Sequence, residues 1–231
     1  MTQRSMQADP NQTIIIKVGT SVVVRGHDGD MLVAETTGRW GLGLERHSAR
    51  QVARARAKVG ETVLFDIKLN KPGALPDENA SDEVIEVKMG TSGEVLVPFS
   101  SNLKIYAGKD IDVQSVKGQV DAYAGLNLNL QDVYQLGNAS AGRSMKIDCQ
   151  SMLGSDVTYN AGRDLRFHVA DLTSARLRVK DIGGYWEARI GAGEKSVYLK
   201  SGGEVTLVTD QKVEAQPPEY ILGKIEKPEA A

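Results

Sequence analysis

The chain has one cysteine, few aromatic residues, no long hydrophobic run and almost no net charge. Its single cysteine, Cys149, excludes an intramolecular disulfide framework and a cysteine-rich zinc site. Aliphatic runs such as residues 14–16 are far shorter than the ~18 residues that a transmembrane helix needs. Residues 1–7 lack the apolar region of a signal peptide. These absences predict a cytoplasmic protein, with surface export by a non-classical route left open.

The overall charge of the chain does not predict binding to nucleic acid. The 28 basic and 30 acidic residues give a net charge of −2, which provides no general attraction to nucleic acid or to anionic membranes. Hydrophobic residues at 41% and charged residues at 25% are typical of a soluble globular protein. The 24 glycines, combined with only 5% aromatic residues, favour a turn-rich β protein.

A short tag ending in glycine recurs through the second half of the chain. The tag glycines are Gly108, Gly125, Gly142 and Gly162, at spacings of 17, 17 and 20 residues, and a weaker version continues to Gly184 and Gly203. Repeats of about 20 residues indicate stacked structural units that cannot bury their apolar faces alone. The sequence therefore predicts a repeat protein with units of 17–22 residues.

Each unit holds two short runs in which apolar and polar residues alternate, as they do in half-buried β-strands. We therefore predict a mainly β fold, specifically a single-stranded β-solenoid (β-helix), with interior columns formed by Ile111, Leu128, Ile147 and Phe167. An antiparallel sandwich is the competing fold. It is less favoured because tight hairpin turns are mostly missing between these runs.

The first ninety residues differ from the repeats. Asp28-Gly29 between alternating runs predicts a hairpin. Residues 48–59 are rich in alanine and arginine, with Ser48 as a helix N-cap and Gly60 just beyond the end, so they predict a helix. The predicted organisation is a disordered N-terminus (1–12), an N-terminal strand and helix cap (13–90), the solenoid repeats (91–210) and a proline-rich tail (211–231).

Two stretches carry a resemblance to known proteins. Residues 19–30 (GTSVVVRGHDGD), followed by residues 93–98 (GEVLVP) and 103–105 (LKI), resemble the order of motifs in a bacterial β-solenoid family described as adhesins, whose function is unknown. The glycine-punctuated repeats also resemble those of bactofilins, short cytoskeletal β-helices that polymerise end to end. The resemblance spans about residues 13–210 and implies a scaffold or a surface-contact protein, and it carries over no catalytic residue.

The residues that could perform chemistry form no recognisable motif. The three histidines, His27, His47 and His168, show no spacing typical of a zinc site. Cys149 alternates with apolar residues and is expected in the core. Three alternating aspartates could imitate the acidic outer face of parallel β-helix polysaccharide lyases, but a solvated strand face is the favoured interpretation; they are Asp110, Asp112 and Asp121. The sequence predicts no catalytic residue, no metal site and no cofactor.

Three surfaces are candidates for contacts with partners. Arg46, Arg50 and Arg54 line one face of the predicted helix and could bind an acidic partner, the alternative being a solvated face. Tyr106 and Tyr123 occupy equivalent positions in successive repeats and could bind a glycan. The apolar cluster Tyr220-Ile221-Leu222 could dock on a neighbouring subunit.

The most favoured function is a non-catalytic scaffold that self-associates, as a homo-oligomer or a filament, through its coil edges or its tail. The repeats support association at low salt, because residues 105–135 carry a balance of −2 and residues 160–200 a balance of +3. The alternative function is an adhesin-like module that recognises a carbohydrate or a protein on its polar strand face.

Overall fold

The computed structural model describes residues 1–9, 11–38, 41–48, 83–152, 157–170, 175–182, 184–190, 195–209, 213–216 and 224–226. Within these ranges the regular secondary structure consists of β-strands alone, so the protein is mainly β as predicted. Hydrogen bonds join all the strands into one open sheet.

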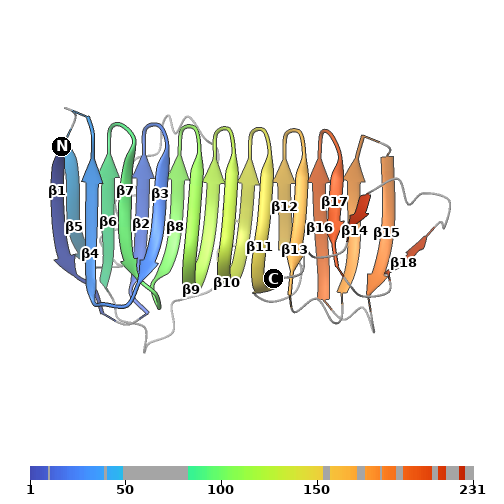
Figure 1. Cartoon of the computed structure of the whole chain (residues 1–231), viewed down its shortest axis with the longest axis horizontal. Coiled ribbons are helices and arrows are strands. Elements are labelled where there is room, and N and C mark those ends of the chain that lie inside the picture. Colours follow the sequence, from blue (N-terminus) through green and yellow to red (C-terminus); the bar gives the residue numbers. More distant parts are fainter. Residues whose placement is uncertain are drawn as a thin grey trace.

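The strands form two rows, and the long strands β9 and β10 take part in both (Figure 1). The first row, in spatial order, is β5 (Leu42–Ser48), β6 (Glu83–Met89), β2 (Thr13–Val18), β8 (Asn102–Ala107), β9 (Ile111–Ala124), β10 (Leu128–Ala141), β12 (Val157–Ala161), β16 (Lys195–Ser201), β14 (Ala175–Asp181), β15 (Gly184–Ile190) and β18 (Val213–Gln216). The second row is β1 (Thr2–Gln7), β4 (Met31–Thr36), β7 (Gly93–Pro98), β3 (Val22–His27), β9, β10, β11 (Met145–Met152), β13 (Leu165–Val169), β17 (Val205–Val208) and β19 (Lys224–Glu226).

Strands one repeat apart pair in parallel, and this pairing stacks the apolar residues. Leu128 lies opposite Ile111 on one side and Met145 on the other. Side chains from both rows meet in one continuous core, where the rings of Tyr159 and Phe167 lie 5.6 Å apart. The four residues predicted for the interior are all buried. They belong to two neighbouring columns, however, because Ile147 pairs with Leu130 and Phe167, two residues along the strands from the column of Ile111 and Leu128.

The glycine of each repeat tag is required by close contact between successive turns. A Cβ atom placed on Gly125 would lie 2.1 Å from the carbonyl oxygen of Gly108, and one on Gly142 would lie 2.1 Å from that of Gly125. A Cβ atom on Gly108, Gly162 or Gly202 would likewise lie 2.1–2.3 Å from the carbonyl oxygen of the glycine in the neighbouring turn. The turns can therefore stack at this spacing only where the side chain is a hydrogen atom.

Both ends of the stack depart from sequence order. The pair β2–β3 lies between β6–β7 and β8–β9, although it precedes both in the chain (Figure 1). At the other end β16 lies between β12 and β14. Antiparallel pairs lie beyond these inserted strands: β1–β4, β4–β7 and β5–β6 at one end, and β14–β15 and β15–β18 at the other, where β17–β19 remains parallel.

Several predicted boundaries differ from the structure. Residues 2–7, expected to be disordered, form β1 because they pair in register with β4. Ser48, expected to cap a helix, instead ends β5, because the run Leu42–Ser48 pairs with 83–89 of β6. The remainder of that predicted helix lies outside the described residues. The expected tail contributes β18 and β19, which pair with β15 and β17.

Candidate functional site

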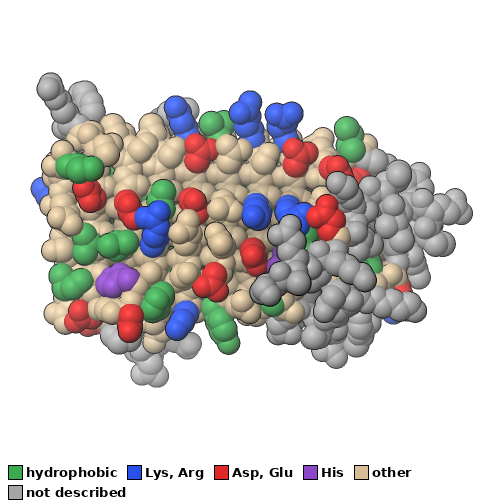
Figure 2. Space-filling model, viewed as in Figure 1, with side chains coloured by type: hydrophobic (Ala, Val, Ile, Leu, Met, Phe, Trp, Pro, Cys, Tyr) green, Lys and Arg blue, Asp and Glu red, His purple; other side chains and the backbone are tan. Residues whose placement is uncertain are grey.

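The outer faces of the strands carry the polar side chains. On the face shown in Figure 2, acidic and basic side chains are interspersed over the described residues, and neither sign forms a continuous patch. Several Lys or Arg side chains project along the upper edge, in line with the turns at the top of Figure 1. Exposed turn residues of this kind include Lys109, Arg143 and Arg163.

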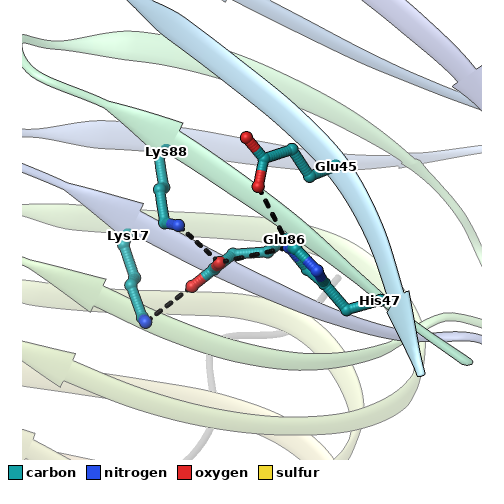
Figure 3. A network of polar contacts seen from close by, with 5 residues as sticks. All are labelled: Lys17, Glu45, His47, Glu86 and Lys88. Atoms are coloured by element: carbon teal, nitrogen blue, oxygen red, sulfur yellow. Dashed lines mark ion pairs between the residues drawn. The ribbon is translucent and has the colours of Figure 1, made fainter. Parts of the chain in front are cut away.

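A group of titratable side chains lies where the edge strand β5 pairs with β6. Glu45 and His47 are two residues apart in β5 and so point to the same face, while Glu86 lies directly opposite Glu45 (Figure 3). We call these three residues the carboxylate–histidine cluster. His47 Nε2 lies 3.1 Å from Glu45 Oε2 and 3.7 Å from Glu86 Oε2. All three donor atoms lie within 4.8 Å of one another.

Two lysines bind the second carboxylate of the cluster. Lys17 Nζ lies 2.6 Å from Glu86 Oε1, and Lys88 Nζ lies 2.7 Å from Glu86 Oε2. Burial acts to raise the pKa of Glu86, but the hydrogen bonds and charges of Lys17 and Lys88 outweigh it and hold that pKa below its ordinary value. The pKa of Lys88 is raised, mainly by its hydrogen bond to Glu86. The Glu86 carboxylate is therefore ionised at neutral pH.

The Nε2 atom of His47 has no aligned hydrogen-bond partner among the described residues. This atom is shielded from solvent although 29% of the side chain is exposed, and the contact with Glu45 does not have hydrogen-bond geometry. The cluster thus brings an imidazole nitrogen close to two carboxylates, without an aligned hydrogen bond from that nitrogen to either of them. Sequence reasoning missed it because Glu86 lies 39 residues from His47; only the alternation Glu45-x-His47 was visible as a signal.

The two tyrosines singled out in the sequence lie against each other. The rings of Tyr106 and Tyr123 stack with centroids 5.2 Å apart and an angle of 8° between their planes. Burial, then the charge of Asp121, raises the pKa of Tyr123 to about 12. Tyr123 lies opposite Ser140 in the next strand, so the aromatic column ends there. One face of each ring is used in the stack, which leaves a glycan only the remaining faces and edges.

A shallow hollow lies near the point where β9 and β10 bend. Ser115 and Asp132 adopt left-handed conformations at this bend, with φ of 54° and 52°, and the Ser115 hydroxyl donates to Asp132 Oδ2 at 3.0 Å. The ammonium of Lys117 lies 4.8 Å from the centroid of the Phe99 ring, and Tyr134 is 52% exposed. The hollow encloses about 340 Å³ and is lined by Phe99, Ser115, Lys117, Asp132, Tyr134 and Gln150.

The aspartates considered as acid–base candidates serve as acceptors between or within strands. Asp110 accepts from the side-chain amide of Asn127 at 2.8 Å, and Asp121 accepts from the backbone N–H of Asn138 at 2.8 Å. Asp112 accepts from Asn129 at 3.2 Å. These contacts hold neighbouring repeats together and give each carboxylate a structural role.

Of the remaining singled-out residues, the structure describes Cys149 and Arg46. Cys149 is buried, and this burial, with the charge of Asp148, raises the pKa of its thiol to about 12. Arg46 lies in β5, where its guanidinium donates to the Gln7 carbonyl at 2.6 Å. Arg50 and Arg54, like the cluster Tyr220-Ile221-Leu222, lie outside the described residues.

Comparison with known proteins gives no neighbour for this chain: no family model, no curated protein and no solved structure matches it. Among the described residues, no helix has the length and apolar character needed to cross a membrane.

Proposed function

We propose that the chain is a β-solenoid and acts as a non-catalytic scaffold that self-associates through the strands at its ends. The parallel pairing of segments 17 residues apart, as between Ile111 and Leu128, supports a coil in which each repeat makes one turn. The roles of Asp110 and Asp121 in joining repeats support a structural outer face over a catalytic one.

The observation that carries the proposal is the open edge at β1. Among the described residues β1 pairs only with β4, and five of its six residues are exposed. An exposed edge strand presents unpaired backbone N–H and C=O groups that can pair with another chain. Proteins usually protect such edges with lysine or proline, and β1 contains neither, with Arg4 as its one charged residue. β1 of one subunit can therefore extend the sheet of another.

The opposite end supplies possible acceptor edges. β18 and β19 each pair with one neighbour among the described residues, β15 and β17 respectively. Joining the β1 end of one subunit to the β18–β19 end of the next would be a heterologous contact, which builds rings or open filaments. The cluster Tyr220-Ile221-Leu222, which lies between β18 and β19 in sequence, is the proposed anchor of this contact.

The test is to block the edge and measure particle size. We expect the purified protein to form particles larger than the 24.9 kDa monomer by light scattering and negative-stain imaging. The double variant Gln3→Lys/Ser5→Lys should reduce them to monomers, because lysine on an edge strand opposes pairing with a second edge. Gln131→Lys/Thr158→Lys places the same charges on exposed positions away from the ends and should leave assembly unchanged.

Two further comparisons separate the possible causes of association. Replacing Tyr220, Ile221 and Leu222 with serine tests the tail without removing β19. Dissociation between about 50 and 500 mM salt would indicate that charge complementarity drives assembly. A monomer under all conditions would refute self-association.

The second candidate is a binding module for carbohydrate or a protein partner, and the hollow beside Tyr134 favours it. An exposed aromatic ring next to an acidic and an amide side chain, here Asp132 and Gln150, is a suitable surface for a sugar. Tyr134→Ser should abolish retention on a glycan support if the hollow binds. Tyr106→Ser/Tyr123→Ser should do so if the stacked tyrosines bind, and neither change should alter assembly.

A further inference from the structure

The carboxylate–histidine cluster has a possible use that the scaffold function does not require. We infer that Glu45, His47 and Glu86 form a binding site for a divalent transition-metal ion of the zinc type. The site lies on the outer face of the β5–β6 pair, and its three donor groups come from two neighbouring strands (Figure 3).

The spacing of the donors fits such an ion. Zinc bonds to nitrogen and carboxylate oxygen are about 2.0–2.2 Å long, so tetrahedral geometry separates neighbouring donor atoms by about 3.3–3.6 Å. His47 Nε2 lies 3.1 Å from Glu45 Oε2 and 3.7 Å from Glu86 Oε2, on either side of that range. The carboxylate oxygens of Glu45 and Glu86 lie within 4.8 Å of each other, and the exposed side chain of Glu45 on the edge strand can move to bring them to that spacing.

The electrostatics of the strand pair also favour a cation. Glu45 and Glu86 lie directly opposite each other, and like charges at directly opposite positions destabilise a pair of strands. His47 Nε2 is directed between them, shielded from solvent and without an aligned hydrogen bond. A metal ion at that point would join all three groups and neutralise the two carboxylates.

The type of ion follows from the donors. An imidazole nitrogen together with carboxylates suits zinc and similar transition metals, whereas calcium and magnesium take oxygen ligands. Three protein ligands leave a fourth position for water.

Lys88 is the competitor for the ion. Its ammonium lies 2.7 Å from Glu86 Oε2, the oxygen nearer to His47, while Lys17 holds Oε1. Because 53% of the Lys88 side chain is exposed, it can turn into solvent when the ion binds. The cost of displacing it weakens binding, so removing Lys88 should strengthen the affinity for zinc.

The test measures zinc binding to the purified full chain. Equilibrium dialysis against zinc sulfate should give one ion per chain, and Co²⁺ in its place should give the visible absorption of a tetrahedral site. His47→Ala and Glu45→Gln should each weaken zinc binding at least about tenfold. The control is His168→Ala, because His168 Nδ1 contacts Asp148 at 3.1 Å in a similar pair without a second carboxylate. This control should bind zinc as the unaltered chain does.

The variant Lys88→Met distinguishes a metal site from a network of ion pairs. A metal site predicts that Lys88→Met binds zinc more tightly than the unaltered chain. The inference is wrong if the unaltered chain and Lys88→Met both bind no zinc, or if His47→Ala binds it as well as His168→Ala does. Far-ultraviolet circular dichroism of each variant establishes that the fold is retained. Glu45, with 57% of its side chain exposed, is the substitution least able to disturb that fold.

Discussion

Replacing a tag glycine with alanine should lower the stability of the folded protein strongly, although glycine has no side-chain functional group to lose. In Gly125→Ala the new Cβ atom would lie 2.1 Å from the carbonyl oxygen of Gly108, nearly an ångström inside the 3.0 Å that real contacts respect. The oxygen belongs to the backbone and the Cβ atom is attached rigidly to the backbone, so relief requires the two turns to separate. Separation strains the bond from the Gly125 N–H to the Ala107 carbonyl, 3.0 Å long in the native chain.

The expected loss is the sum of two effects. Overpacking in a closely packed region costs about 1–3 kcal/mol, and a weakened backbone hydrogen bond costs about 0.5–1.5 kcal/mol. Gly125→Ala should therefore lower the free energy of unfolding by about 1.5–4.5 kcal/mol, measured by urea denaturation followed by circular dichroism. Gly41→Ala is the matched control, because a Cβ atom there meets nothing within 4 Å. Equal stability of the two variants would refute the explanation of the repeat given above.

Three other side chains allow direct tests. Tyr159→Phe should raise the free energy of unfolding by about 1 kcal/mol, since the buried Tyr159 hydroxyl lacks a hydrogen-bond partner among the described residues; a clear loss of stability in urea denaturation would contradict this. The Cys149 thiol should resist a thiol-specific chromogenic reagent in the folded protein and react fully in urea, and fast native reaction would show that the core opens locally. Because burial raises the pKa of this thiol from 9.0 to about 12, its contribution to stability should be complete below about pH 9 and be lost as the pH rises to about 12; Cys149→Ala should lack this loss. Tyr106→Ala should lower the pKa of Tyr123 from about 12 towards its ordinary value, as followed by phenolate absorbance, and an unchanged value would show that Asp121 and the sheet alone cause the shift.

The parts of the fold that could be predicted from the sequence are those specified by neighbouring residues. Alternation placed Ile111, Leu128 and Phe167 in the interior, and the recurrence of glycine marked the turns. Both signals are local, since they depend on one strand or on turns one repeat apart. They establish strands and their buried faces but not the order in which distant strands stack.

The rest depends on pairings between residues far apart in the chain. Asp28-Gly29 predicted a hairpin of β3 and β4, but this prediction was wrong, because β7 lies between the two strands and pairs with both. Nothing in the local sequence indicates that β2 pairs with both β6 and β8, more than sixty residues later. The alanine-rich composition after Ser48 favoured a helix, while Ser48 itself pairs with Glu83 in a strand. The carboxylate–histidine cluster depends on the same antiparallel pairing, because His47 and Glu86 meet only when β5 lies beside β6.

The insertion of β2 between β6 and β8 has a consequence for the synthesis of the chain. Ile14, Ile15 and Ile16 leave the ribosome early, yet the strand that contains them pairs with residues 84–89 and 102–107. At about 5–20 residues per second, the 84 residues from Val18 to Asn102 take roughly 4–17 s to translate. Until residues 84–89 have been made, which takes most of that interval, these three consecutive isoleucines, all buried in the finished protein, have neither of their sheet neighbours. The nascent N-terminal segment therefore exposes apolar surface, of the kind that chaperones cover, until β6 has been made.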